Sequence, residues 1–206
     1  MKRLGMWSAS TQGVLGVVYA ATLGIGMNAT GFDQPIVDPV LAIMELLTLV
    51  SAPLLVVMMA AVHVAAPADY KACSLTALAF MILVAGLTSA VHFVGLTALR
   101  QVGAAGLAWP SPLYALELLA WDIFLGLSLL FAAPVFQGSG LKRSIRLCLL
   151  ATGGLCLTGS IGPATGDMRY QFIAVVGYGA LLPVTCFLLA RSFRGASVHG
   201  GAHHAA

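Results

Sequence analysis

Charged side chains are scarce in this chain of 206 residues. Asp, Glu, Lys and Arg make up 8% of it, whereas roughly 25% is usual in a soluble domain. Hydrophobic residues make up 60% of the chain. The composition therefore excludes an ordinary water-soluble domain. The formal net charge of +3 is not gathered into a basic stripe, so nucleic acid is not expected as a partner.

Cysteine is also scarce, and its spacing excludes the usual cysteine chemistry. The four cysteines form no CxxC or metal-finger pattern. Cys73, Cys148 and Cys186 fall at or near helix ends that we assign to the cytoplasm, and Cys156 lies inside a helix. A disulfide framework is therefore not expected.

Several membrane cofactor sites are excluded by missing residues. No hydrophobic run has an interior lysine, which excludes a retinal Schiff base. The only histidines in these runs, His63 and His92, lie at opposite depths, which excludes a bis-histidine haem and a zinc site with three protein ligands. GxSxG, HExxH and a credible GxGxxG are also missing. We therefore expect no cofactor and no metal.

Long hydrophobic runs are what the sequence does contain. A bilayer-spanning helix takes about 20 residues, and runs of that length cover residues 7–28, 39–66, 71–99, 112–134, 144–163 and 170–193. Gly- and Pro-containing breakers separate them. The sequence predicts an all-α, polytopic integral membrane protein. We expect a single domain of six transmembrane helices over residues 1–194, followed by a flexible tail over residues 195–206.

The basic residues predict the orientation of this bundle, because cytoplasmic loops carry an excess of Lys and Arg. With the N-terminus in the cytoplasm, only Arg100 and Arg169 lie outside. The cytoplasmic set is Lys2, Arg3, Lys71, Lys142, Arg143, Arg146, Arg191 and Arg194. Both termini and the tail are therefore predicted to be cytoplasmic, with Asp33, Asp38 and Asp167 in the outer loops. We expect this protein in the inner (plasma) membrane of a bacterium.

Four ionisable side chains lie within the outer half of three consecutive predicted helices. From the helix rise of 1.5 Å per residue, their depths below the outer helix ends are about 8 Å for Glu117, 9 Å for Glu45, 12 Å for His92 and 15 Å for Asp122. Ionisable residues inside a membrane usually face a bundle interior or a water-filled cavity. We therefore predict that the four converge on one pocket and are the candidate catalytic residues, with Asp122 first because it is deepest.

Six further side chains at comparable depth are candidate binding residues. Residues three or four apart share a helical face, which groups Thr88 and Ser89 with His92, and Trp121 with Glu117. The complete set is Tyr19, Thr48, Thr88, Ser89, Trp121 and Tyr178. Each also has a structural interpretation, because Ser and Thr often bond to their own or a neighbouring membrane helix and tyrosines often only pack.

Three kinds of function stay open on this evidence. The pocket suits binding of membrane lipids or of a small apolar or amphipathic ligand, or a role in membrane assembly. A carboxyl and histidine set also suits acid–base catalysis on a lipid or isoprenoid substrate, as in an isomerase or cyclase. The third candidate is a proton-coupled carrier of a small molecule. The sequence does not choose among them, and it does not predict the oligomeric state.

Overall fold

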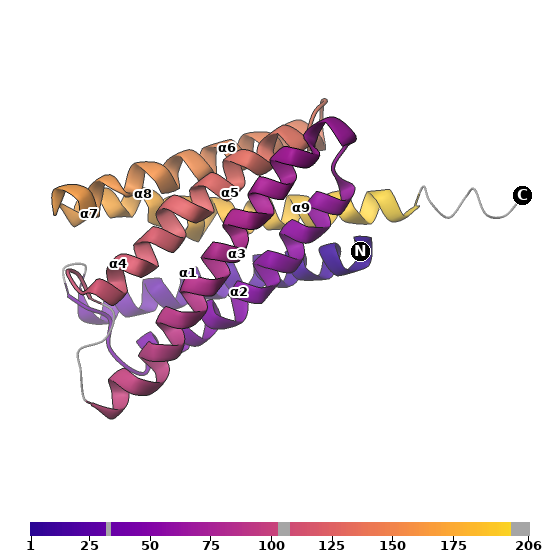
Figure 1. Ribbon diagram of the computed structural model, residues 1–206. Coiled ribbons are helices and arrows are strands. Elements are labelled where there is room, and N and C mark those ends of the chain that lie inside the picture. Colours follow the sequence, from indigo (N-terminus) through magenta and orange to yellow (C-terminus); the bar gives the residue numbers. More distant parts are fainter. Residues whose placement is uncertain (32–33, 103–107, 199–206) are drawn as a thin grey trace, which may run out of the picture.

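The computed structural model describes residues 1–31, 34–102 and 108–198, and within these ranges all regular structure is helical (Figure 1). Six stretches are long and apolar enough to cross a membrane: Lys2–Thr30, Val40–Ala65, Ala68–Leu99, Pro112–Val135, Leu141–Thr165 and Met168–Gly195. The prediction of an all-α chain with six such helices is confirmed.

The first two stretches are the single helices α1 (Lys2–Thr30) and α2 (Val40–Ala65). The other four contain turns of a different helical type. In chain order they are built from η1 (Ala68–Tyr70), α3 (Lys71–Val94) and η2 (Gly95–Leu99); α4 (Pro112–Leu118), η3 (Leu119–Phe124), α5 (Leu125–Ala132) and η4 (Ala133–Val135); α6 (Leu141–Gly159) and α7 (Ile161–Thr165); and η5 (Met168–Tyr170), α8 (Gln171–Val176), η6 (Gly177–Leu181) and α9 (Leu182–Val198).

The helices run past the predicted hydrophobic runs at several ends. α1 begins at Lys2 rather than at residue 7, and α6 begins at Leu141 rather than at residue 144. The added residues include Lys and Arg, which are good helix formers, so the helix continues beyond its apolar part. The predicted tail begins at Gly195, but α9 continues to Val198. Asp33 and the remainder of that tail, residues 199–206, lie outside the described residues.

The six stretches form a closed ring in chain order. Each packs against the next, and the last helix, α9, packs against the first, α1. Short connections make neighbours antiparallel, so the start of α1 and the end of α9 lie at the same end of the ring (Figure 1).

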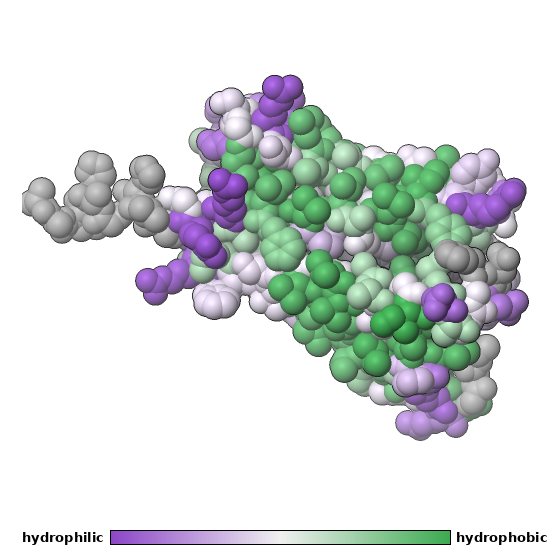
Figure 2. All heavy atoms as spheres, turned by 180° about the vertical axis from the view of Figure 1, so that it is seen from behind, coloured by the Kyte–Doolittle hydropathy of each residue, from purple (hydrophilic) through white to green (hydrophobic). Residues whose placement is uncertain are grey.

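The two ends of the ring differ in charge. The end with the N-terminus carries the eight Lys and Arg residues assigned above to the cytoplasm, and we call it the basic end. The opposite end is formed by residues 31, 34–39, 100–102, 108–111 and 160–170, and we call it the cavity end. Figure 2 shows hydrophilic residues at both ends and hydrophobic residues between them.

Large apolar side chains cover the outside of the ring as well as its core. Leu4, Val14, Ile82 and Val184 are each exposed by 48% or more. Exposed apolar surface of this extent marks a face that contacts something other than water. The fold is therefore compatible with a membrane protein.

The core divides into an apolar and a polar part along the ring axis. In the half near the basic end, the large buried side chains include Met58, Met81, Leu129 and Ile145. The buried ionisable side chains lie in the other half; they are Glu45, His92 and Asp122. This division places the candidate site at the cavity end.

Candidate functional site

Two neighbouring chambers that share part of their walls lie towards the cavity end. The wide chamber has a volume of about 510 Å³, and its walls come from α1, α2, α3, α4, α8, η6 and the loops at this end. The narrow chamber, of about 100 Å³, lies deeper and reaches Gln12, Ser51 and Trp121. Five residues line both chambers, and we call them the collar: Tyr19, Thr48, Tyr114, Glu117 and Tyr178.

His92 and Glu117 are joined by a hydrogen bond in the wall of the wide chamber. His92 Nε2 lies 2.8 Å from Glu117 Oε1, which joins α3 to α4. His92 Nδ1 and Glu117 Oε2 are buried without a hydrogen-bond partner within the described residues. The pair therefore keeps one unused donor or acceptor on each member.

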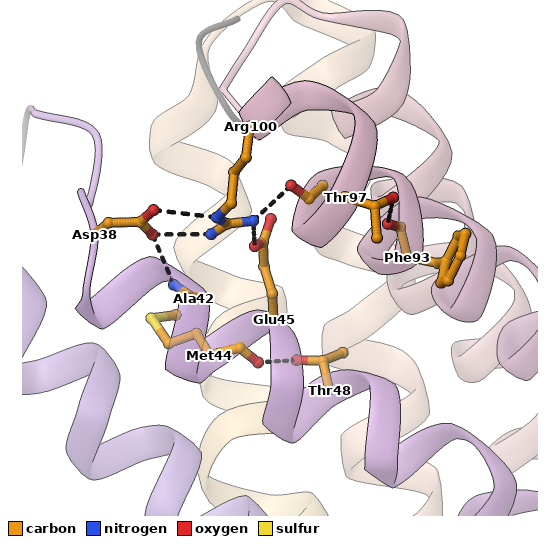
Figure 3. Close-up of polar contacts among 9 residues, drawn as sticks. Asp38, Ala42, Met44, Glu45, Thr48, Phe93, Thr97 and Arg100 are labelled. Atoms are coloured by element: carbon orange, nitrogen blue, oxygen red, sulfur yellow. Dashed lines mark hydrogen bonds and ion pairs between the residues drawn. The ribbon is translucent and has the colours of Figure 1, made fainter. Parts of the chain in front are cut away.

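Glu45 is held by Arg100, which follows the π-helical turn η2 (Figure 3). Arg100 Nη1 donates to Glu45 Oε2 at 2.7 Å, and it also donates to the carbonyl oxygen of Gly95. Glu45 is only 1% exposed. A Cβ atom at Gly95 would lie against the Glu45 carboxylate, so glycine allows this close approach.

The same arginine ties the loop before α2 to the end of η2. Arg100 Nε and Nη2 donate to the two oxygens of Asp38 at 3.1 and 2.9 Å, a two-point contact that Figure 3 shows beside the Glu45 contact. These hydrogen bonds hold the pKa of the Asp38 carboxyl below its ordinary value. One guanidinium therefore binds two carboxylates, one from the loop before α2 and one from α2 itself.

Asp122 occupies a separate place in the core. It is fully buried, and its Oδ1 accepts a hydrogen bond from Gln171 Nε2 at 3.1 Å. It lines neither chamber. The adjacent Trp121 lines the narrow chamber, because neighbouring positions on a helical turn point in different directions. The structure thus brings Glu45, His92 and Glu117 together around the wide chamber and leaves Asp122 beside Gln171.

The six candidate binding residues divide in the same way. Tyr19, Thr48 and Tyr178 belong to the collar, and Trp121 lines the narrow chamber. Thr88 is buried and Ser89 is half-buried, and neither lines a chamber. These two positions on α3 therefore contribute packing rather than cavity wall.

Two side chains of the site, Tyr114 and Arg100, were missed in the sequence. Tyr114 lies three residues before Glu117, so the spacing rule for one helical face would have found it. Arg100 was assigned only to a loop, and no local spacing links it to Glu45, 55 residues earlier.

Arg169 adds a second guanidinium to the wall of the wide chamber. It bonds to Asp167 with contacts as short as 2.6 Å. The hydrogen bonds from Arg169 lower the pKa of Asp167 to about 2. The charge of Arg169 is therefore matched locally.

Three of the turns near the chambers are π-helical: η2, η3 and η6. A π-helical turn fits one more residue than an α-helical turn and is frequent at functional sites. η3 carries Trp121 and Asp122, and η6 carries Tyr178. In this protein these turns set the direction of side chains at the collar and behind it.

No group of three His, Cys, Asp or Glu side chains able to hold a metal ion occurs in the part of the chain that the structure describes. No protein-family model, curated protein or solved structure matches this chain. The site is therefore interpreted from its geometry.

Proposed function

We propose that this protein is an integral membrane protein whose two chambers bind a small amphipathic or lipid-like molecule. The observation that carries this proposal is the wide chamber of about 510 Å³, because sites for small molecules occupy roughly 300–1,000 Å³. Its wall combines apolar side chains such as Leu23, Met44 and Phe172 with the ionisable Glu45, His92 and Glu117. Apolar walls with a few fixed polar groups are typical of such sites.

The charge difference between the ends supports the orientation of the bundle. Eight basic residues gather at the end that carries both termini, and two lie at the cavity end. By the positive-inside rule the basic end faces the cytoplasm. The chambers then lie towards the outer leaflet, where an amphipathic molecule can enter from the membrane or from the outside.

Fusion reporters test this orientation. We expect a reporter fused after Arg194 to lie in the cytoplasm and one inserted after Gly31 to lie on the outer side, because these positions lie at opposite ends of the ring. A fluorescent protein reports a cytoplasmic position, and alkaline phosphatase reports an outer one. Arg194 on the outer side would contradict the orientation, and both positions on one side would contradict the six-span arrangement.

Filling the wide chamber tests ligand binding. Val175 lines that chamber, and its neighbour Val176 on α8 is 53% exposed on the outside of the ring. We expect Val175→Trp to remove a bound molecule by occupying its volume, while Val176→Trp keeps it. Native mass spectrometry of the purified protein measures the bound mass.

The two variants add the same side chain at adjacent positions, so their folding is compared directly by thermal unfolding. Equal bound mass in both variants would place the ligand elsewhere on the protein. The proposal would be overturned if the wild-type protein carries no bound molecule and also retains none when amphiphiles are added to the detergent solution.

A further inference from the structure

Four aromatic side chains surround the junction between the two chambers. Tyr19, Tyr114 and Tyr178 belong to the collar, and Trp121 lines the narrow chamber beside them. The ring centroids of Trp121 and Tyr178 are 5.5 Å apart, and their planes are tilted by 60°. These side chains come from α1, α4, η3 and η6, so aromatic rings enclose the junction from several helices.

The collar also contains one carboxyl group, that of Glu117. Its Oε1 binds His92, while its Oε2 is buried without a partner within the described residues. The other charged side chains of the chamber walls are matched by opposite full charges, Glu45 by Arg100 and Arg169 by Asp167. Glu117 pairs only with a histidine, which carries a charge only when it is protonated. The collar is therefore the place in the cavity that favours an added positive charge.

We infer that the collar binds the ammonium group of an amphipathic organic amine. This inference rests on the proposed function and names the chemical class of its ligand. The faces of aromatic rings attract cations at distances within about 6 Å of the ring centre. A carboxylate accepts a charge-assisted hydrogen bond from N–H, and the Glu117 side chain lines both chambers. An anionic head group would be repelled by the same carboxylate.

The chamber sizes orient this ligand. The narrow chamber, of about 100 Å³, is much smaller than the wide chamber, of about 510 Å³. It therefore accepts a head group and not a hydrocarbon chain. The wide chamber is lined on its apolar side by Leu23, Ile36 and Phe172 and accepts the body of the molecule. The ammonium group of the ligand then lies at the junction and points towards the narrow chamber. The apolar part of the ligand extends towards the cavity end.

Three probes that differ only in head-group charge test the inference: octylammonium, octanol and octanoate. Isothermal titration calorimetry is done on the full chain in an uncharged maltoside detergent, with protein-free micelles as the blank. At pH 7 an alkylammonium is charged, as a lysine side chain is. We expect octylammonium to bind at least about tenfold more tightly than octanol, and octanoate more weakly than either.

Substitutions in the collar should remove the preference for the cation. Glu117→Gln and Tyr178→Leu are each expected to bring octylammonium affinity down towards that of octanol, while octanol binding itself persists and reports an intact fold. Trp7→Leu and Asp69→Asn are the controls, because these residues lie at the basic end, far from the collar. Both controls are expected to retain the preference.

The outcomes separate this inference from the proposed function. Equal affinity for octylammonium and octanol, or a preference that survives Glu117→Gln, would overturn the ammonium assignment. If Val175→Trp still abolishes octanol binding in that case, the cavity remains a site for amphipathic molecules. Failure of all three probes, together with equal bound mass in Val175→Trp and Val176→Trp, would overturn both.

Discussion

Replacing Arg100 with methionine is expected to reduce the free energy of unfolding by about 3–5 kcal/mol. Glu45 is 1% exposed and has Arg100 as its ion-pair partner, so the substitution leaves a carboxylate buried without a cation. Methionine keeps a long apolar stem, so most of the packing is retained. For a chain of this length the melting temperature should fall by on the order of 10 °C, as measured by thermal unfolding in detergent.

The second substitution Glu45→Gln separates loss of the charge pair from loss of packing. We expect the double variant Arg100→Met with Glu45→Gln to recover most of the stability, because an amide in the core carries no charge to compensate. Arg169→Met is the matched control, since the Arg169 side chain is 88% exposed and that of its partner Asp167 is 31% exposed; it should change the melting temperature little. A double variant as unstable as Arg100→Met alone would show that the arginine acts through packing.

Two neighbouring glycines of α6 are expected to respond to alanine with opposite signs. A Cβ atom at Gly153 would lie 2.8 Å from the carbonyl oxygen of Gly126, where α6 crosses α5, so Gly153→Ala forces two backbones apart. Overpacking of this kind costs about 1–3 kcal/mol. At Gly154 no atom lies within 4 Å of the added Cβ. Gly154→Ala should stabilise the protein by roughly 0.5–1 kcal/mol, because alanine favours helix.

Thermal unfolding of the two alanine variants under one set of conditions measures this difference. Because the substitutions are identical and adjacent, effects of detergent and expression are shared. If both variants melt at the same temperature, α5 and α6 do not approach at Gly126 and Gly153 as closely as described. A destabilised Gly154→Ala would instead indicate that its face contacts something beyond the described chain.

The sequence predicts the six long helices well because a membrane-spanning helix depends on the summed hydrophobicity of consecutive residues. Each hydrophobic run is long, and the breakers between runs are clear, so the elements are found within a few residues of their bounds. Depth along a helix is also additive, at ~1.5 Å per residue. This is why Glu45, His92 and Glu117 are found together around the wide chamber.

The remaining features of the site depend on local helix type and on contacts between distant residues, and neither follows from sums along the chain. A π-helical turn is made of the same residue types as an α-helical one, so η3 leaves no pattern that separates Trp121 in the narrow chamber from Asp122 beside Gln171. The contact between Arg100 and Glu45 joins residues far apart in the chain. Spacing rules for one helix describe only neighbours three or four positions away.

The closure of the ring by α1 and α9 sets an order in time for completing the site. The pairs of Arg100 with Glu45 and of His92 with Glu117 lie within the first four stretches, so synthesis of these stretches supplies every residue that they need. The collar takes Tyr19 from the first stretch and Tyr178 from the sixth. During synthesis, α1 can pack against α2 first, and its contact with α9 must wait for the last stretch. The two pairs can form on a partial ring, whereas the aromatic enclosure requires the whole one.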